Sequence, residues 1–175
     1  AHGLARGHYI LATIHRAENT DHPDRLLAIM HALGTVAAEH PVVMPLHPRT
    51  RHTLTEGAWE APPGMHILSP LGYLDLQALE HHARLIITDS GGIQKEAFFH
   101  RVPCLTLRDE TEWVELVESG WNRLVPPSSS GTIVAAVREA LEAGLPPEPD
   151  VPLYGDGTAA PRIAELLGNF PGVKR

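Results

Sequence analysis

The fold is decided by the stretch Thr88-Asp89-Ser90-Gly91-Gly92-Ile93-Gln94-Lys95-Glu96, in a sequence of 175 residues. The apolar run Leu85–Ile87 before it predicts a buried strand at Leu85–Thr88, and the stretch leads into Ile93–Phe99, where we expect a helix. A strand, a tight Gly-Gly turn and a helix start can cradle a phosphate, because the first helical N–H groups face the anion. Ser90 can add a hydroxyl donor, and Glu96 can accept two hydroxyl groups of a ribose. The same residues also fit a plain helix start, with Ser90 as its N-cap and Glu96 as a surface glutamate.

Apolar runs and helical patterns alternate on both sides of this stretch. We expect further strands at Tyr9–Ile14, Val42–Leu46, Met65–Ser69, Pro103–Leu107 and Asn122–Val125. We expect further helices at Pro23–Glu39, Asp75–His82, Gly131–Ala143 and Ala159–Leu167, and one capped by Thr111 that ends at Glu118. The Pro-rich segment that begins at residue 145 is expected to cross irregularly to the last helix. The alternation predicts an α/β, Rossmann-like, doubly wound parallel sheet of about six strands.

Cationic and titratable residues follow four of the expected strands. They are His15 and Arg16, His47 with Arg49 and Arg51, Asp89 to Gly92, and Arg108 to Glu110. In doubly wound sheets ligands bind outside the carboxyl ends of the strands. The sequence therefore predicts an anion-binding site at that edge of the sheet.

Two of these clusters have more than one interpretation. His15 can donate to a phosphate or shuttle a proton, with Glu18 holding its orientation, but a polar loop with a local salt bridge is also possible. His47 with Arg49 and Arg51 fits a second anion site and fits equally well a loop that offsets nearby acids.

Composition argues against several classes of partner. The net charge of -7 disfavours nucleic acid and anionic membranes. The single cysteine, Cys104, excludes an internal disulfide framework and suits a reducing cytoplasm. No apolar run is long enough to span a membrane and no signal-peptide pattern is present, so we expect a cytoplasmic protein. The opening Ala1-His2-Gly3, without a methionine, indicates a segment of something longer.

Other chemistries lack their motifs. The 12 histidines include no His-Glu-x-x-His pattern and there is no cysteine pair, so we expect no metal site. There is no Walker loop and no Gly-x-Ser-x-Gly elbow, so Ser90 is not expected to be a nucleophile. Trp59, Trp113 and Trp121 are expected to be packing anchors.

The ordered set of motifs resembles the C-terminal domain of non-hydrolysing UDP-N-acetylglucosamine 2-epimerases. The matching segments are Thr13 to Asn19, Pro45 to Pro48, Pro70 to Leu74, Thr88 to Ala97, Leu107 to Glu112 and Tyr154 to Gly157. The chain departs from the family at Trp113-Val114, where members often have Arg-Pro. It also has Leu76 where some members have an aromatic residue near the uracil.

The resemblance implies one half of a two-domain GT-B fold, occupying residues 1–175, with the N-terminal domain absent from this chain. By this likeness His15 is a catalytic residue near the diphosphate or sugar, with Arg16 and Arg108 as further UDP contacts. Ser90 and the backbone of Gly91 and Gly92 hold phosphate oxygens, and Glu96 holds the ribose. His47, with Arg49 beside it, corresponds to an allosteric nucleotide-sugar site in some members.

The implied reaction is inversion at C2 of UDP-GlcNAc to give UDP-ManNAc, without metal or redox cofactor. The implied partners are UDP-GlcNAc or UDP, the N-terminal domain and a second subunit in a homodimer. Because the proton-transfer carboxylates of the family come mostly from the N-terminal domain, we expect this chain alone to bind UDP weakly and to catalyse nothing. The alternatives are a GT-B glycosyltransferase, a hydrolysing epimerase, an epimerase for a UDP-diacetamido uronic acid, and a non-catalytic nucleotide-sugar sensor.

Overall fold

The computed structural model describes residues 5–56, 59–149 and 152–170. Within these residues the core is a six-stranded sheet of order β3-β2-β1-β4-β5-β6, and all neighbouring strands are parallel. The strands are β1 Ile10–Thr13, β2 Val42–Pro45, β3 Met65–Leu68, β4 Leu85–Thr88, β5 Cys104–Thr106 and β6 Asn122–Leu124. Each one lies inside the range expected from the sequence, so the predicted doubly wound sheet is confirmed.

Helices connect the strands on both sides of the sheet. They are α1 Ala17–Thr20, α2 Pro23–Ala37, α3 Pro48–Glu56, α4 Tyr73–His82, α5 Gly91–Phe99, α6 Val114–Glu118, α7 Ser130–Ala143 and α8 Ala159–Gly168. Neither α1 nor α3 was expected. The helix α3 begins at Pro48, a residue whose fixed φ suits the first helical position.

The starts of α4, α5 and α6 differ from those expected, and α5 begins at Gly91 instead of Ile93. The prediction that Thr111 caps a helix is wrong: α6 begins at Val114, and Trp113 occupies the N-cap position. The Thr111 hydroxyl instead donates to Gln94 Oε1 at 2.6 Å. The helix α4 begins at Tyr73, two residues earlier than expected.

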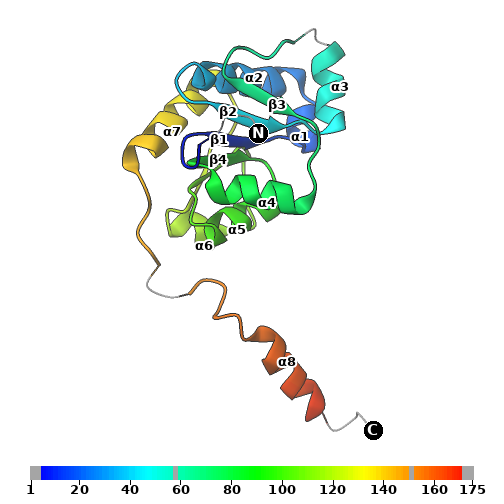
Figure 1. Cartoon of the computed structure of the whole chain (residues 1–175), viewed down its shortest axis with the longest axis vertical. Coiled ribbons are helices and arrows are strands. Elements are labelled where there is room, and N and C mark those ends of the chain that lie inside the picture. Colours follow the sequence, from blue (N-terminus) through cyan, green and yellow to red (C-terminus); the bar gives the residue numbers. More distant parts are fainter. Residues whose placement is uncertain (1–4, 57–58, 150–151, 171–175) are drawn as a thin grey trace.

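The helices form one layer on each face of the sheet (Figure 1). Side chains alternate along a strand, so Ile10 and Ala12 of β1 pack in the cluster that includes residues of α2 and α7. Leu11 points to the other face, where α4 and α5 contribute Leu76, Leu79, Ile93 and Ala97. The sheet is thus buried on both faces, which explains the continuous apolar runs in its sequence.

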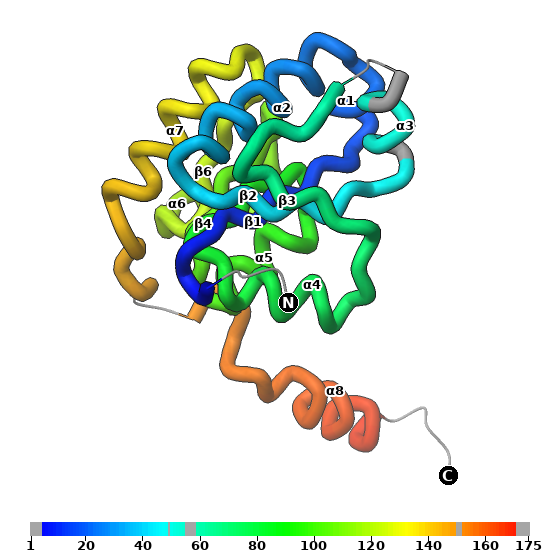
Figure 2. Tube along the Cα trace, turned by 45° about the horizontal axis from the view of Figure 1, so that its top comes forward, coloured from blue at the N-terminus to red at the C-terminus, as the bar shows by residue number. Residues whose placement is uncertain are grey.

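The last helix differs from the others. None of the residues of α8 is buried, and both views show it standing away from the sheet and its helices (Figures 1 and 2). The segment before it is anchored, because Leu153 and Tyr154 pack against the cluster of Phe98, Leu116 and Trp121. Across the described residues, the structure contains no helix with the length and apolar character of a membrane span.

Candidate functional site

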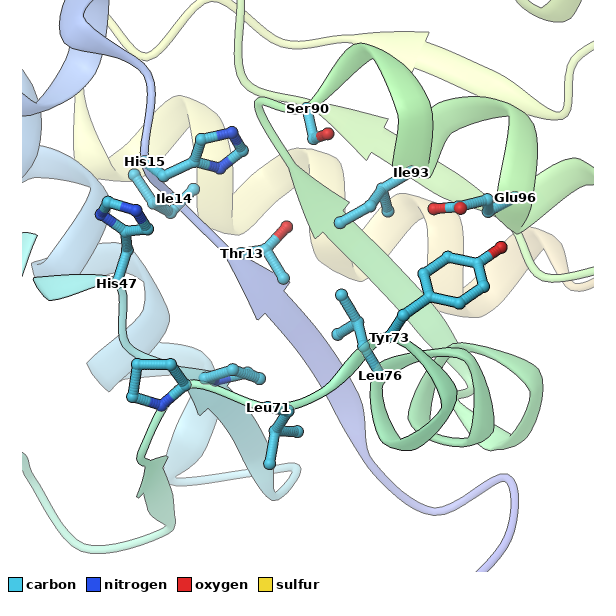
Figure 3. A pocket seen from close by; sticks show the side chains of 12 residues that line it. Thr13, Ile14, His15, His47, Leu71, Tyr73, Leu76, Ser90, Ile93 and Glu96 are labelled. Atoms are coloured by element: carbon cyan, nitrogen blue, oxygen red, sulfur yellow. The ribbon is translucent and has the colours of Figure 1, made fainter.

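A cavity of about 480 Å³ lies at the carboxyl ends of β1 and β4. These two strands are neighbours, but the chain proceeds outward from them in opposite directions, to β2 and β3 on one side and to β5 and β6 on the other. This is the topological switch point at which doubly wound sheets bind ligands. The lining residues are Thr13, Ile14, His15, Pro45, His47, Pro70, Leu71, Tyr73, Leu76, Ser90, Ile93 and Glu96 (Figure 3).

Ser90 stands between β4 and α5, with its side chain in the cavity. It occupies the N-cap position of α5, as the alternative interpretation of the sequence expects, but its side chain makes no capping hydrogen bond. Gly91 and Gly92 form the first turn of α5, where N–H groups have no partner within the helix. A side chain at Gly91 would overlap the carboxylate of Glu112, so the end of that half-exposed side chain would have to move aside.

Asp89, rather than Glu18, holds His15. His15 Nδ1 lies 3.3 Å from Asp89 Oδ1, and the backbone N–H of His15 donates to both carboxylate oxygens at 3.1 Å. Glu18 instead lies 3.7 Å from Arg16. The sequence-based assignment of Glu18 as the residue that orients His15 is therefore wrong.

The Asp89 carboxylate is fully buried, and hydrogen bonds satisfy its charge. The backbone N–H of Arg16 and the side-chain amide of Asn19 both donate to its Oδ2 at 3.0 Å. Asn19 also donates to the Leu107 carbonyl at the end of β5. One carboxylate thus joins the ends of β1, β4 and β5 beneath the cavity.

The opposite end of the cavity is more apolar. Glu96 of α5 faces Tyr73 of α4 there, with Leu76 and Ile93 beside them (Figure 3). The Tyr73 side chain is unusually exposed for an aromatic residue, at 66% of its full area. An exposed ring at the rim of a cavity is available to cover a ligand.

A buried acid lies behind this end of the cavity. Glu80 of α4 is fully buried, and its Oε1 finds no hydrogen-bond partner among the described residues. Its Oε2 accepts from Gln77 Nε2 at 2.8 Å, and His100 Nε2 lies 3.9 Å away. Burial and the nearby charge of Glu96 raise the pKa of Glu80 to about 8, so this carboxyl group is mainly protonated at neutral pH.

The two arginines that were predicted to contact UDP lie outside the cavity lining. Neither Arg16 nor Arg108 is among the cavity-lining residues. Arg108 is almost fully buried, and its Nη1 lies 2.8 Å from Glu112 Oε2. A hydrogen bond from its own backbone N–H and the Arg108 guanidinium hold the pKa of Glu112 below its ordinary value. Arg108 therefore already balances an acid beside the first turn of α5.

His47 does line the cavity, and its ring centroid lies 6.1 Å from that of His15. Arg49 belongs to α3, but its side chain lies outside the described part of the structure. No group of three His, Cys, Asp or Glu side chains that could hold a metal ion occurs among the described residues.

Sequence reasoning missed two residues of the site. Asp89 stands inside the deciding stretch, but its contact with His15 spans 74 positions and depends on β1 and β4 being neighbours. Tyr73 stands in the expected loop before α4, and the earlier helix start brings it to the cavity. The sheet order gives the signal for Asp89, whereas no sequence pattern gives one for Tyr73.

Several known proteins are similar to this chain in sequence and in architecture. The profile of the UDP-N-acetylglucosamine 2-epimerase family matches residues 1–168. A UDP-2,3-diacetamido-2,3-dideoxy-D-glucuronate 2-epimerase of Pseudomonas aeruginosa is 48% identical over 93% of this chain and 45% of its own length. A UDP-N-acetylglucosamine 2-epimerase of Methanocaldococcus jannaschii is 36% identical over 91% of this chain and 44% of its own length.

Solved structures agree with these sequence matches. The M. jannaschii enzyme in complex with UDP-GlcNAc and UDP aligns with a TM-score of 0.79 and 36% identity, over 91% of this chain and 45% of that one. The Neisseria meningitidis enzyme bound to UDP-GlcNAc aligns with a TM-score of 0.73 and 31% identity, over 91% and 44%. The chain spans about half the length of these relatives, as one half of a GT-B fold does. The chain belongs to the UDP-N-acetylglucosamine 2-epimerase family.

Proposed function

We propose that this chain is the UDP-binding half of an epimerase that inverts C2 of a UDP-linked 2-acetamido sugar. One observation carries the proposal: three residues from different elements line one cavity at the switch point of the sheet. His15 follows β1, Ser90 follows β4, and Glu96 lies on α5. The cavity volume of about 480 Å³ lies within the range of small-molecule sites.

The proposed ligand lies along this cavity. The diphosphate accepts hydrogen bonds from the Ser90 hydroxyl and from the N–H groups of Gly91 and Gly92, because a helix N-terminus favours an anion. His15 contacts the diphosphate or the sugar. Glu96 accepts the two ribose hydroxyl groups at the other end. Arg16 and Arg108 add positive charge near the phosphates without lining the cavity.

The proposed reaction is an elimination followed by an addition. A base removes the proton from C2 of the sugar while the bond from C1 to the UDP oxygen breaks, which leaves a glycal and UDP. C2 is then protonated on its other face and UDP re-forms the bond to C1. In this proposal the phosphate-binding turn holds UDP between these steps, and His15 assists as a catalytic residue.

We propose that the remaining part of the active site belongs to a domain outside this chain. The proton-transfer carboxylates belong to an N-terminal domain, which contacts the free apolar face of α8. That face carries Ile163, Leu166 and Leu167, all exposed, as expected of a helix that packs against another domain. We therefore propose that the isolated chain binds UDP weakly and is inactive, and that the complete protein is a cytoplasmic homodimer.

The sugar is the open part of the proposal. UDP-GlcNAc is the first candidate because the solved neighbours hold it. The second candidate is a UDP-diacetamido uronic acid, which the 48% identity to the P. aeruginosa enzyme favours over the 36% identity to the M. jannaschii enzyme.

Calorimetric titration of the 175-residue chain with UDP tests the binding site. Ser90→Ala and Glu96→Gln should each weaken UDP binding by about 10-fold, as expected for a lost hydrogen bond to a charged group. The matched control is Glu139→Gln on α7, an exposed acid paired with Arg123 away from the cavity, which should leave the affinity unchanged. Equal affinities for all four proteins would contradict the proposed site.

The complete protein tests the reaction. Incubation with UDP-GlcNAc in D₂O, without acceptor, should give UDP-ManNAc carrying deuterium at C2. Free ManNAc would mean a hydrolysing epimerase. Unchanged sugar would direct the same assay to the UDP-diacetamido uronic acid, and failure of both substrates would contradict the proposed reaction.

A further inference from the structure

His15 contacts Asp89 through one particular edge of its ring. Nδ1 lies 3.3 Å from Asp89 Oδ1, whereas Nε2 stands on the far edge of the same imidazole. The ring lies over the cavity beside Ser90 (Figure 3), while Asp89 is buried beneath it. The two ring nitrogens of His15 therefore have different surroundings.

Asp89 cannot turn away from His15. Its Oδ2 accepts from the backbone N–H of Arg16 and from the Asn19 amide, both at 3.0 Å. Asn19 is itself fixed, because its Nδ2 also donates to the Leu107 carbonyl and its Oδ1 accepts from Arg25 Nε. The orientation of the carboxylate is thus set by the ends of β1, β4 and β5.

An ionised carboxylate only accepts hydrogen bonds, so the nitrogen that faces Asp89 has to carry the hydrogen. Hydrogen bonding at one ring nitrogen decides which nitrogen of a neutral histidine is protonated. At 3.3 Å the two atoms are slightly farther apart than in an ordinary N–H···O hydrogen bond and within the distance of an ion pair.

We propose that Asp89 is a positioning residue for His15: it keeps a hydrogen on Nδ1 and so presents Nε2 to the bound diphosphate or sugar. Neutral His15 then accepts a proton at Nε2, and protonated His15 donates from Nε2 to a phosphate oxygen while Asp89 balances its charge. The identity of the ligand rests on the proposed function, whereas the tautomer of His15 does not.

The tautomer is measured directly by long-range ¹H–¹⁵N correlation spectra of the ligand-free chain, at a mildly alkaline pH where an ordinary imidazole is neutral. His15 should show a protonated Nδ1 and an unprotonated Nε2. The exposed His31 of α2 is the reference for a histidine without this carboxylate. A His15 that carries its hydrogen on Nε2 would overturn the proposal.

Asp89→Asn should reverse the tautomer, because its amide can donate to Nδ1. If this variant does not fold, the spectrum of the unmodified chain still decides the question.

Two substitutions of His15 identify the nitrogen that meets the ligand. His15→Gln places an amide N–H near the former Nε2, whereas His15→Asn places one near the former Nδ1. With UDP as the probe, His15→Gln should stay within about 3-fold of the original affinity, and His15→Asn should lose about 10-fold or more. Equal losses, or the reverse order, would overturn the proposal.

These readouts separate the two claims. If the unmodified chain shows no UDP binding, the proposed function fails and the His15 tautomer alone decides whether Asp89 positions the ring. If UDP binds and the tautomer is the opposite one, the proposed function stands and the role of Asp89 is overturned.

Discussion

The two ends of the cavity are built in different ways. We call one the strand-end wall, formed by Thr13, His15 and Ser90 and backed by Asp89. The other is the helix wall, formed by Tyr73, Leu76 and Glu96. The buried Glu80 does not line the cavity, but it lies on the same helix as Tyr73 and Leu76 and feels the charge of Glu96. Behind the strand-end wall, a buried carboxylate has several hydrogen-bond donors. Behind the helix wall, a buried carboxyl oxygen has no partner among the described residues.

This difference indicates which part of the site is formed before the ligand arrives. The strand-end wall is fixed by the backbone of two adjacent strands and by Asp89, so it is preorganised for a charged group. In the helix wall, the charge of Glu96 acts on the buried Glu80, whose pKa it helps to raise, and Tyr73 is exposed to solvent. We therefore expect the diphosphate end to tolerate few changes and the nucleoside end to respond to pH and to the ligand.

The largest effect is expected from Asp89→Ala. It leaves the buried N–H groups of His15 and Arg16 without an acceptor, so the free energy of unfolding should fall by about 3–5 kcal/mol. Urea unfolding followed by tryptophan fluorescence measures this. The control Asp109→Ala removes an exposed acid that pairs with Arg25 and should cost less than about 1 kcal/mol. Similar losses for both variants would contradict the claim that Asp89 fixes the strand-end wall.

The pH dependence of stability should change most with Glu80→Gln. The pKa of Glu80 is raised from 4.5 to about 8 by folding, so its protonated form is stabilised in the native state. The contribution of Glu80 to the free energy of unfolding is fully present below the ordinary glutamate pKa, and it is lost as pH rises towards about 8. The loss amounts to a few kcal/mol, since one unit of pKa shift corresponds to about 1.4 kcal/mol.

Glutamine mimics the protonated acid, so the variant should gain stability relative to the original chain as pH rises from 5 to 9, the range that brackets the titration of Glu80. Urea unfolding at a series of pH values gives this difference directly. His100 has its pKa lowered by burial and lies 3.9 Å from Glu80, so the measured difference reports the two groups as a coupled pair. A constant difference across the pH range would contradict a shifted Glu80.

A smaller effect is expected from Tyr73→Ala. If the ring covers the base, its loss should weaken UDP binding by about 5- to 10-fold, because stacking of a base on an aromatic ring contributes about 1–3 kcal/mol. The neighbouring Leu74 is the matched control: it is 80% exposed and does not line the cavity. Calorimetry that finds no difference between Tyr73→Ala and Leu74→Ala would exclude Tyr73 from the site.

The smallest effect is expected from Thr13→Val in the strand-end wall. Its hydroxyl shares a hydrogen bond with that of Thr88 at 2.6 Å, so the substitution should cost about 1 kcal/mol of stability, measured by urea unfolding. UDP affinity should change little. A large loss of affinity without a loss of stability would instead make Thr13 a ligand contact.

The sheet could be predicted from the sequence because each strand is a short apolar run between turn residues. Leu85–Thr88 located β4, and the glycines after it located the start of α5 to within two residues, at Gly91 instead of Ile93. The helices α1 and α3 were missed because their sequences are polar. Thr111 was misassigned because a tertiary contact with Gln94 takes its hydroxyl away from the helix start.

The sequence could predict which residues follow the strands and so belong to the candidate site, but not which of those residues contact one another. His15 and Ser90 were found because polar residues follow apolar runs. Asp89 was not linked to His15 because the contact exists only when β1 and β4 lie side by side. The sequence did not single out Glu80, because its burial follows only from the packing of the helices against the sheet.

The most direct test of the account is a titration of the ¹⁵N-labelled 175-residue chain with UDP, followed by backbone amide shifts. Saturable shifts should concentrate at Ser90, Gly91, Gly92 and Glu96 and at His15. The amides of α7, which lie away from the cavity, should stay unchanged. The absence of saturable shifts, or shifts confined to α7 and its surroundings, would contradict a UDP site at the ends of β1 and β4.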